Sequence, residues 1–127
     1  MCSLPNGWQA FCDYDWRSLL MDTRGFVTCI TIVAESIVES RLLEGLTASG
    51  ARGWTITPAR GSGPKHQGMS EIEGGSIRVE VLASATVADR IWQLLREDYF
   101  TNYSIAAWEY PVQVDRAERY CDPAPPR

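Results

Sequence analysis

The alternation of apolar and polar residues along the chain predicts four strands and two helices. Residues 76–83 give the clearest strand pattern, because three apolar side chains share one face and charged side chains lie between them. A period of two is typical of a strand that buries one face. Residues 26–33 are apolar on both faces and rich in β-branched side chains, which indicates a central strand.

Two further segments complete the predicted sheet. Residues 53–60 are typical of a strand, and Pro58 within them has no backbone N–H, so we expect this strand at an edge. Residues 105–114 form the fourth predicted strand.

The first predicted helix covers residues 37–49. Ser36 and Glu39 have the spacing of a capping box, and apolar residues follow at intervals of four. Gly50 is placed to end the helix in a left-handed turn.

The second predicted helix runs to about Tyr99. Thr86 and Asp89 offer a cap at its start, and apolar residues recur at i, i+4, i+7 and i+8 from Val87. This spacing predicts one buried stripe along the helix.

This order of elements predicts an α+β, ferredoxin-like βαββαβ sandwich. Two right-handed crossovers interleave into a four-stranded antiparallel sheet with both helices on one face. The other face would carry Cys29 or Ile30 and apolar residues of the last strand. We therefore expect other subunits to cover that face.

The chain is long enough for one domain, which we place at residues 25–115. Residues 116–127 form a tail that we expect to fray. Residues 1–24 are an N-terminal extension with two interpretations. They form a docking arm, or translation begins at Met21 and the preceding residues are not part of the native protein.

Charge and composition exclude several classes of function. A net charge of -4 argues against general nucleic-acid binding, which favours basic proteins. No segment has the pattern of a signal peptide or of a membrane helix, so we expect a cytoplasmic protein without membrane insertion. The cysteines have neither disulfide nor zinc-site spacing and are expected as free thiols; they are Cys2, Cys12, Cys29 and Cys121.

The segment between the second and third strands, residues 61–75, holds five of the ten glycines and has no periodicity. A loop of this length in a small domain is typically functional or disordered. Gly61 and Gly63 at its base let the backbone approach a ligand and can turn N–H groups toward a phosphate. Because Arg60 and Lys65, the single lysine, flank them, we predict a phosphate-bearing ligand at this place.

Other polar residues of this loop do not form a recognisable catalytic or metal site. His66 stands alone, so it is either a solvated side chain or a contact to phosphate or bicarbonate. Glu71 and Glu73 are expected to face solvent or a partner protein. We predict no metal and no catalytic residue.

Several motifs together resemble the PII signalling family, nearest its carboxysome-associated and bicarbonate-transport PII-like branch. The resemblance covers about residues 26–110. Its signs, in chain order, are Thr31-Ile-Val-Ala-Glu-Ser36, Gly53-Trp-Thr55, Arg60-Gly-Ser-Gly-Pro-Lys65, Ile77-Arg-Val-Glu-Val-Leu82 and Tyr99-Phe-Thr-Asn-Tyr103.

Three departures from the family pattern narrow the resemblance. The loop lacks the tyrosine that nitrogen-regulating PII proteins can have uridylylated, which argues against signalling by that route. The glycine- and lysine-rich turn before the last strand is replaced by Thr101-Asn-Tyr-Ser104. Cys121 stands alone, so the chain lacks the cysteine-closed tail found in the PII-like partner of the bicarbonate transporter. The sequence does not indicate a role for Cys121.

The resemblance implies a non-enzymatic trimer that binds ADP, AMP or ATP, with or without bicarbonate, in clefts between subunits. It would report energy or inorganic-carbon status through the 61–75 loop to a target such as a bicarbonate transporter or carboxysome component. Adenine would lie near Thr55, residues 81–83 and the 102–103 turn, although strand packing alone would also explain Thr55 and Val81. The implied nucleotide-binding residues are Thr55, Arg60, Gly61, Ser62, Gly63, Lys65, Val81, Leu82, Ala83, Asn102 and Tyr103.

Alternatives remain open at this point. Arg116 and Arg119 either reach a neighbour's phosphates or belong to a solvated tail, and the second interpretation is favoured. A slow nucleotide phosphohydrolase could use the same cleft, although no general base or magnesium carboxylate set is evident. An amino-acid-sensing module of related topology would bind nucleotide poorly.

Overall fold

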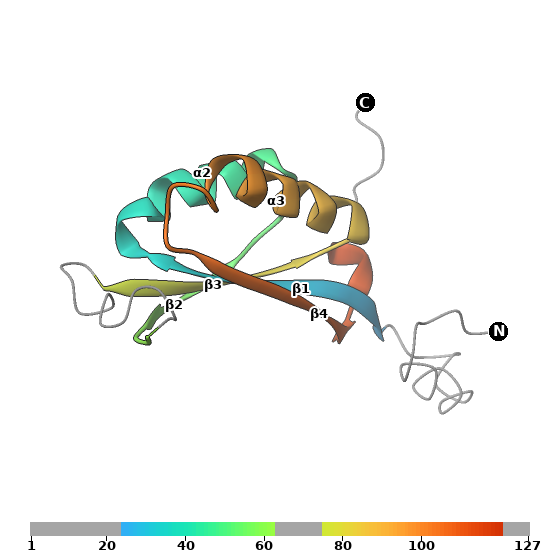
Figure 1. The fold of residues 1–127 in the computed structure, drawn as a ribbon. Coiled ribbons are helices and arrows are strands. Elements are labelled where there is room, and N and C mark those ends of the chain that lie inside the picture. Colours follow the sequence, from blue (N-terminus) through green and yellow to red (C-terminus); the bar gives the residue numbers. More distant parts are fainter. Residues whose placement is uncertain (1–23, 63–74, 121–127) are drawn as a thin grey trace.

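The computed structural model describes residues 24–62 and 75–120, which form a four-stranded antiparallel sheet covered by two helices (Figure 1). This confirms the predicted fold class. The elements are β1 Arg24–Glu35, the 3-10 helix η3 Ser36–Val38, α2 Glu39–Ala48, β2 Thr55–Ala59, β3 Ser76–Ala83, α3 Ala85–Asp98, β4 Ala106–Asp115 and the 3-10 helix η5 Ala117–Arg119.

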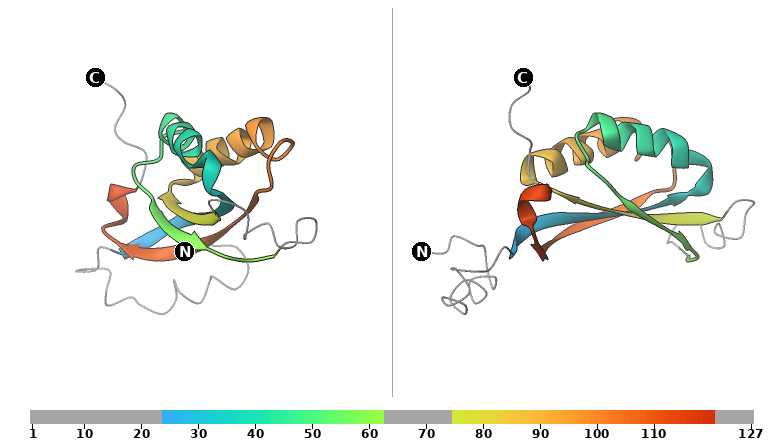
Figure 2. Two further views of the ribbon diagram at one scale, coloured as in Figure 1. Left: turned by 90° about the vertical axis from the view of Figure 1, so that its left-hand side faces the viewer. Right: turned by 180° about the vertical axis from the view of Figure 1, so that it is seen from behind.

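The strands are ordered β2-β3-β1-β4 across the sheet. β1 pairs with β3 and β4, so the prediction of a central first strand is confirmed. β2 lies at one edge, as Pro58 predicted, and β4 lies at the other. Both helices lie on the same face of the sheet in all views (Figures 1 and 2).

The hydrophobic core lies between the helices and one face of the sheet. Ile30 of β1 lies opposite Val81 of β3, and all the β3 positions that the alternation assigned to one face are buried there. The fully buried side chains of this core include Ile30, Ile32, Leu42, Leu46, Val79, Val81, Ile91 and Leu95. Burial of one such aliphatic side chain contributes roughly 1.5–3 kcal/mol, so this layer holds the elements in place.

The side of the sheet that faces away from the helices, called the open face below, carries the alternate residues of each strand. Its central residues are Cys29 of β1 and Leu82 of β3, which lie opposite one another, so the expected residue on this face is Cys29 and not Ile30. Trp108 and Tyr110 of β4 lie on the same face, 41% and 38% exposed. The open face includes Val27, Cys29, Thr31, Val33, Thr55, Thr57, Arg78, Glu80, Leu82, Trp108, Tyr110, Val112 and Val114.

The helix starts differ from those predicted. Ser36 does not cap α2, because residues 36–38 first form the η3 turn and Val38 precedes α2, with no side-chain cap hydrogen bond at either start. The cap of α3 is Ser84 rather than Thr86, since the Ser84 hydroxyl accepts a hydrogen bond from the Val87 N–H at 3.3 Å. Gly50 follows α2 with a φ of 107°, which agrees with the predicted stop.

Replacing Ser84 with Ala is expected to lower the free energy of unfolding by about 1 kcal/mol, because an N–H in the first turn of α3 loses its acceptor. Denaturant unfolding followed by circular dichroism measures the change. Thr86→Ala is the matched control and should shift stability by less than about 0.5 kcal/mol, since Thr86 lies inside the helix. Equal effects of the two substitutions would contradict this assignment of the cap.

The C-terminal segment is ordered further than predicted. Residues 117–119 form η5, and the Arg52 Nη1 donates a hydrogen bond to the Arg119 carbonyl oxygen at 2.9 Å. A Cβ at Gly25 would come within 2.9 Å of the Ala117 Cβ, so this turn packs closely on β1. The prediction that the tail frays from residue 116 is therefore wrong for residues 116–120, and residues 121–127, with Cys121, lie outside the described part.

Candidate functional site

The predicted phosphate-binding residues follow directly after the edge strand β2. Thr55 begins β2 and is exposed on the open face. Arg60, Gly61 and Ser62 follow its last residue and are all exposed. The remaining members of this group, Gly63, Lys65 and the loop residues His66, Glu71 and Glu73, lie outside the described residues.

Gly61 leaves space beside the chain. A Cβ added there would meet no atom within 4 Å. Within the described residues only Gly50 and Gly75 have a positive φ among the glycines, so Gly61 does not have the left-handed geometry that an anion-binding nest requires. The fold itself therefore does not require glycine at this position, and the backbone can be approached from outside.

The three predicted residues at the end of β3 differ in access. Val81 is fully buried and Ala83 is 2% exposed, so their side chains belong to the core. Leu82 is half-buried on the open face. Because β2 begins at Thr55 opposite Glu80, the last three residues of β3 extend beyond it, and only their backbone and the Leu82 side chain are placed for a ligand.

The turn between α3 and β4 holds the last two predicted residues. Asn102 is exposed, and Tyr103 packs against the core while its hydroxyl accepts a hydrogen bond from Arg41 Nη1 at 2.9 Å. The Asn102 and Tyr103 N–H groups both donate to the Tyr99 carbonyl oxygen, which closes the turn. Burial raises the pKa of the Tyr99 hydroxyl, and the Arg41 guanidinium partly offsets that rise.

A single chain does not bring all the candidate residues together. Thr55 and residues 60–62 lie at the β2 edge, whereas the 102–103 turn leads into β4 at the opposite edge. Three strand spacings of about 4.8 Å separate these edges, roughly 14 Å in all. The candidate residues of one chain therefore fall into two groups at opposite edges of the sheet.

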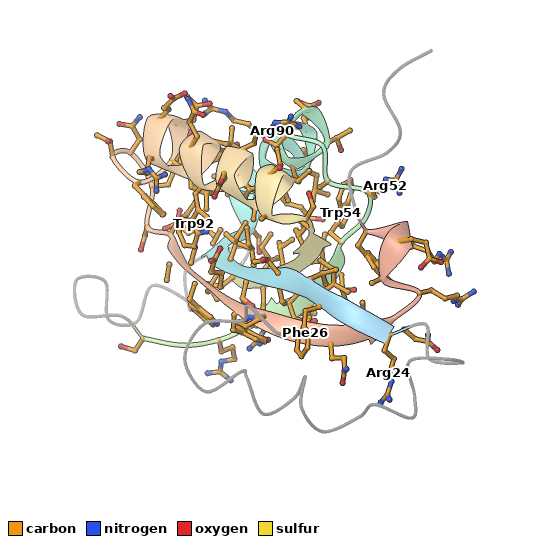
Figure 3. All side chains as sticks on the ribbon, turned by 90° about the vertical axis from the view of Figure 1, so that its right-hand side faces the viewer. Arg24, Phe26, Arg52, Trp54, Arg90 and Trp92 are labelled. Carbon is orange, nitrogen blue, oxygen red and sulfur yellow. The ribbon has the colours of Figure 1, made fainter. Side chains whose placement is uncertain are left out.

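The arginines of the C-terminal turn lie at a third place. Arg116 and Arg119 are exposed on the turn that packs against the start of β1. The Arg119 carbonyl oxygen accepts a hydrogen bond from Arg52, which lies on the loop between α2 and β2 and is labelled in Figure 3. The 102–103 turn lies at the other end of β4. Within residues 24–62 and 75–120, no group of three His, Cys, Asp or Glu side chains is placed to hold a metal ion.

Comparison with known proteins shows the family. The family model for the nitrogen regulatory protein P-II matches residues 27–118, and the chain belongs to this PII family. A protein of Thermus thermophilus, provisionally assigned as a PII-like signalling protein, is 45% identical and has a TM-score of 0.67. The match covers 79% of this chain and 99% of that one.

A more distant structure shares the fold. It is CPII, a nitrogen regulatory PII-like protein of Thiomonas intermedia K12, solved with ADP, AMP and bicarbonate bound. Its TM-score is 0.71 at 14% identity, over 78% of this chain and 97% of that one. Among curated proteins, none matches this chain.

Proposed function

We propose that this chain is a PII-like regulatory protein that binds ADP, AMP or ATP, with bicarbonate as a second ligand, in clefts between subunits. The observation that carries the proposal is the division of the candidate residues between two opposite edges of the sheet. A second chain placed with its β4 edge against the β2 edge of the first would complete the site. Proteins of this family are in general regulators and not enzymes.

We assign the phosphates to the base of the 61–75 loop. Exposed Arg60 offers a planar guanidinium for a bidentate contact, and the open space beside Gly61 admits a phosphate close to the backbone. Ser62 adds a hydroxyl donor. Gly63 and Lys65 are assigned to the same group by the resemblance, with Lys65 as a second cation.

We assign the adenine ring to the region where β3 extends beyond β2. Thr55 and Leu82 both lie on the open face there, and the backbone of residues 81–83 has one edge without a β2 partner. Backbone groups of this kind can bind the edge of a base, while Leu82 offers an apolar surface. Asn102 and Tyr103 of the neighbouring chain would approach from the other side.

The assembly that we propose is a homotrimer in which the open faces are covered by neighbouring chains. Trp108 and Tyr110 are large aromatic side chains on a face that the helices leave uncovered. Apolar patches of this kind mark interaction sites in proteins. Packing of neighbouring chains against the open faces would also bring the β2 and β4 edges of different chains together.

The output of the proposed switch is the 61–75 loop. A nucleotide that contacts the loop base in only one conformation shifts the loop toward that conformation, and a target protein would recognise the result. We propose that this protein acts in the cytoplasm and that its target is a bicarbonate transporter, because the CPII structure holds bicarbonate as well as nucleotide. Only the sequence resemblance supports a carboxysome component as the target. No helix within the described residues is long and apolar enough to cross a membrane.

Isothermal titration of the full chain with ADP, AMP and ATP tests the proposal. We expect saturable binding of at least one of these nucleotides. Absence of binding at millimolar concentrations of all three, with and without bicarbonate, would overturn the proposed function.

Lys65→Ala is expected to weaken ADP binding about tenfold and to leave adenosine binding nearly unchanged, because a charge-assisted contact to phosphate contributes about 1.5–3 kcal/mol. Titration of both ligands into both proteins measures the difference. An equal loss for ADP and adenosine would contradict the assignment of Lys65 to the phosphates.

A further inference from the structure

Arg41 of α2 is held above the turn between α3 and β4 by three contacts. Its Nη1 donates to the Tyr103 hydroxyl at 2.9 Å. Its guanidinium carbon lies 5.4 Å from the centroid of the Tyr99 ring and 5.8 Å from that of Tyr103. The two rings are 5.6 Å apart, so together they form one aromatic support for the cation.

Among the described residues, no ion pair neutralises the charge of this arginine. Arg41 is exposed, and the ion pair between Arg78 and Glu80 does not involve it. Glu44 and Asp98 are the acidic groups close to Tyr99, and neither is within ion-pair distance of Arg41. Most N–H donors of the guanidinium are thus left for another acceptor.

The turn below Arg41 carries no cation of its own. Residues 99–104 read Tyr-Phe-Thr-Asn-Tyr-Ser, without Lys or Arg. Arg41 is therefore the basic side chain seen in contact with this turn, and its contact reaches across 62 positions of the sequence.

We propose that Arg41 binds a phosphate group of the adenine nucleotide from the β4-side half of the cleft. This inference rests on the proposed function, because it takes Asn102 and Tyr103 to be part of that cleft. A guanidinium suits a phosphate through two parallel N–H contacts. Since the two rings already restrict the side chain, binding costs less conformational entropy than it would for a free arginine.

A purely structural role predicts different behaviour. If Arg41 only joined α2 to the turn, its loss would lower stability and weaken every ligand of the cleft alike. If it binds phosphate, its loss weakens ligands in proportion to the phosphate charge they carry. Adenosine and ADP therefore separate the two roles.

The test is calorimetric titration of Arg41→Met with ADP and with adenosine. We expect about tenfold weaker ADP binding and less than about twofold change for adenosine. Arg41→Lys keeps the charge but not the planar fork, so its ADP affinity should lie between those of Arg41→Met and the wild type. Tyr103→Phe keeps the ring and removes the hydrogen bond, so we expect a smaller loss than for Met.

Arg90→Met is the matched control. Arg90 lies on α3 with its guanidinium beside Gly50, past the far end of α2 (Figure 3). The nine residues from 41 to 50 span roughly 13 Å at helical rise. The same loss of charge there should leave ADP binding unchanged.

Each other outcome overturns the inference. Unchanged ADP affinity in Arg41→Met would exclude a phosphate contact, and equal losses for ADP and adenosine would leave only the structural role. Loss of bicarbonate binding with intact ADP binding would assign Arg41 to the other anion. If wild type binds ADP and Arg41→Met does not differ, only this inference fails; if wild type binds no nucleotide, the proposed function fails as well.

Discussion

Replacing Trp108 with Glu is expected to convert the proposed homotrimer into folded monomers that no longer bind ADP. Trp108 lies opposite Thr31 in the middle of the open face and is 41% exposed in the single chain, so part of its side chain meets solvent there. In the trimer the same position would be covered, and a carboxylate buried without a partner costs on the order of 3 kcal/mol or more per chain. Because each proposed cleft needs two chains, we expect at least about a hundredfold loss of ADP affinity.

Light scattering after size-exclusion chromatography, combined with titration of ADP, measures both effects. Phe100→Glu is the control for assembly, because Phe100 is 39% exposed but its ring lies against that of Trp92 on α3, tilted by 54°, on the helix side of the molecule. It should remain trimeric. A Trp108→Glu protein that stays trimeric would contradict the interface, and a monomeric one that still binds ADP normally would contradict the shared cleft.

Most of the fold could be predicted from the sequence because burial imposes a period on it. β3 alternates strictly since only one of its faces meets the helices, and its predicted and observed bounds are the same. β1 is apolar on both faces because it lies at the centre of the sheet, with Cys29 on the open face and Ile30 in the core. Because both sides of a central strand are apolar, the pattern did not indicate whether Cys29 or Ile30 points toward the helices.

The helix caps were harder to predict because the sequence offers several candidates. Ser84 and Thr86 can each accept a hydrogen bond from a helix N–H, and the one that does so is set by where the chain leaves β3. Ser36 failed as a cap because a 3-10 turn intervenes before α2. The ordered turn at residues 117–119 was missed because its contacts are with Gly25 and Arg52, far away in sequence.

The candidate site residues also differ in whether local sequence or distant contacts determine their positions. Arg60, Gly61 and Ser62 follow a strand end, and their exposure follows from that position. Val81 was assigned to the buried face by the same alternation that defined β3, so its core position was already contained in the pattern. Arg41 could not be found, because no pattern on α2 indicates a contact 62 residues away.

The second large expected effect is a loss of ADP binding when either edge of the proposed shared cleft carries an added carboxylate. Gly61→Glu places a carboxylate at the proposed phosphate position on the β2 edge, where an added side chain meets open space, so the domain should fold. Asn102→Glu places one in the exposed turn before β4. Every cleft of either homotrimer then contains one damaged half, because Gly61→Glu sets a carboxylate against the phosphates and Asn102→Glu buries one beside the adenine ring. Either change is expected to reduce ADP binding at least about a hundredfold.

Mixed trimers of these two variants test the central claim most directly. A Gly61→Glu chain still has an intact β4 edge and an Asn102→Glu chain an intact β2 edge, so each mixed trimer regains one undamaged cleft. The variants are co-expressed with different tags, the mixed trimers are purified through both tags, and ADP is titrated. A Gly61→Glu chain co-expressed with a differently tagged copy of itself is the control and should bind no ADP. We predict that the mixed trimers bind ADP with wild-type affinity at one site per trimer; mixed trimers that bind no ADP would contradict a site shared between chains.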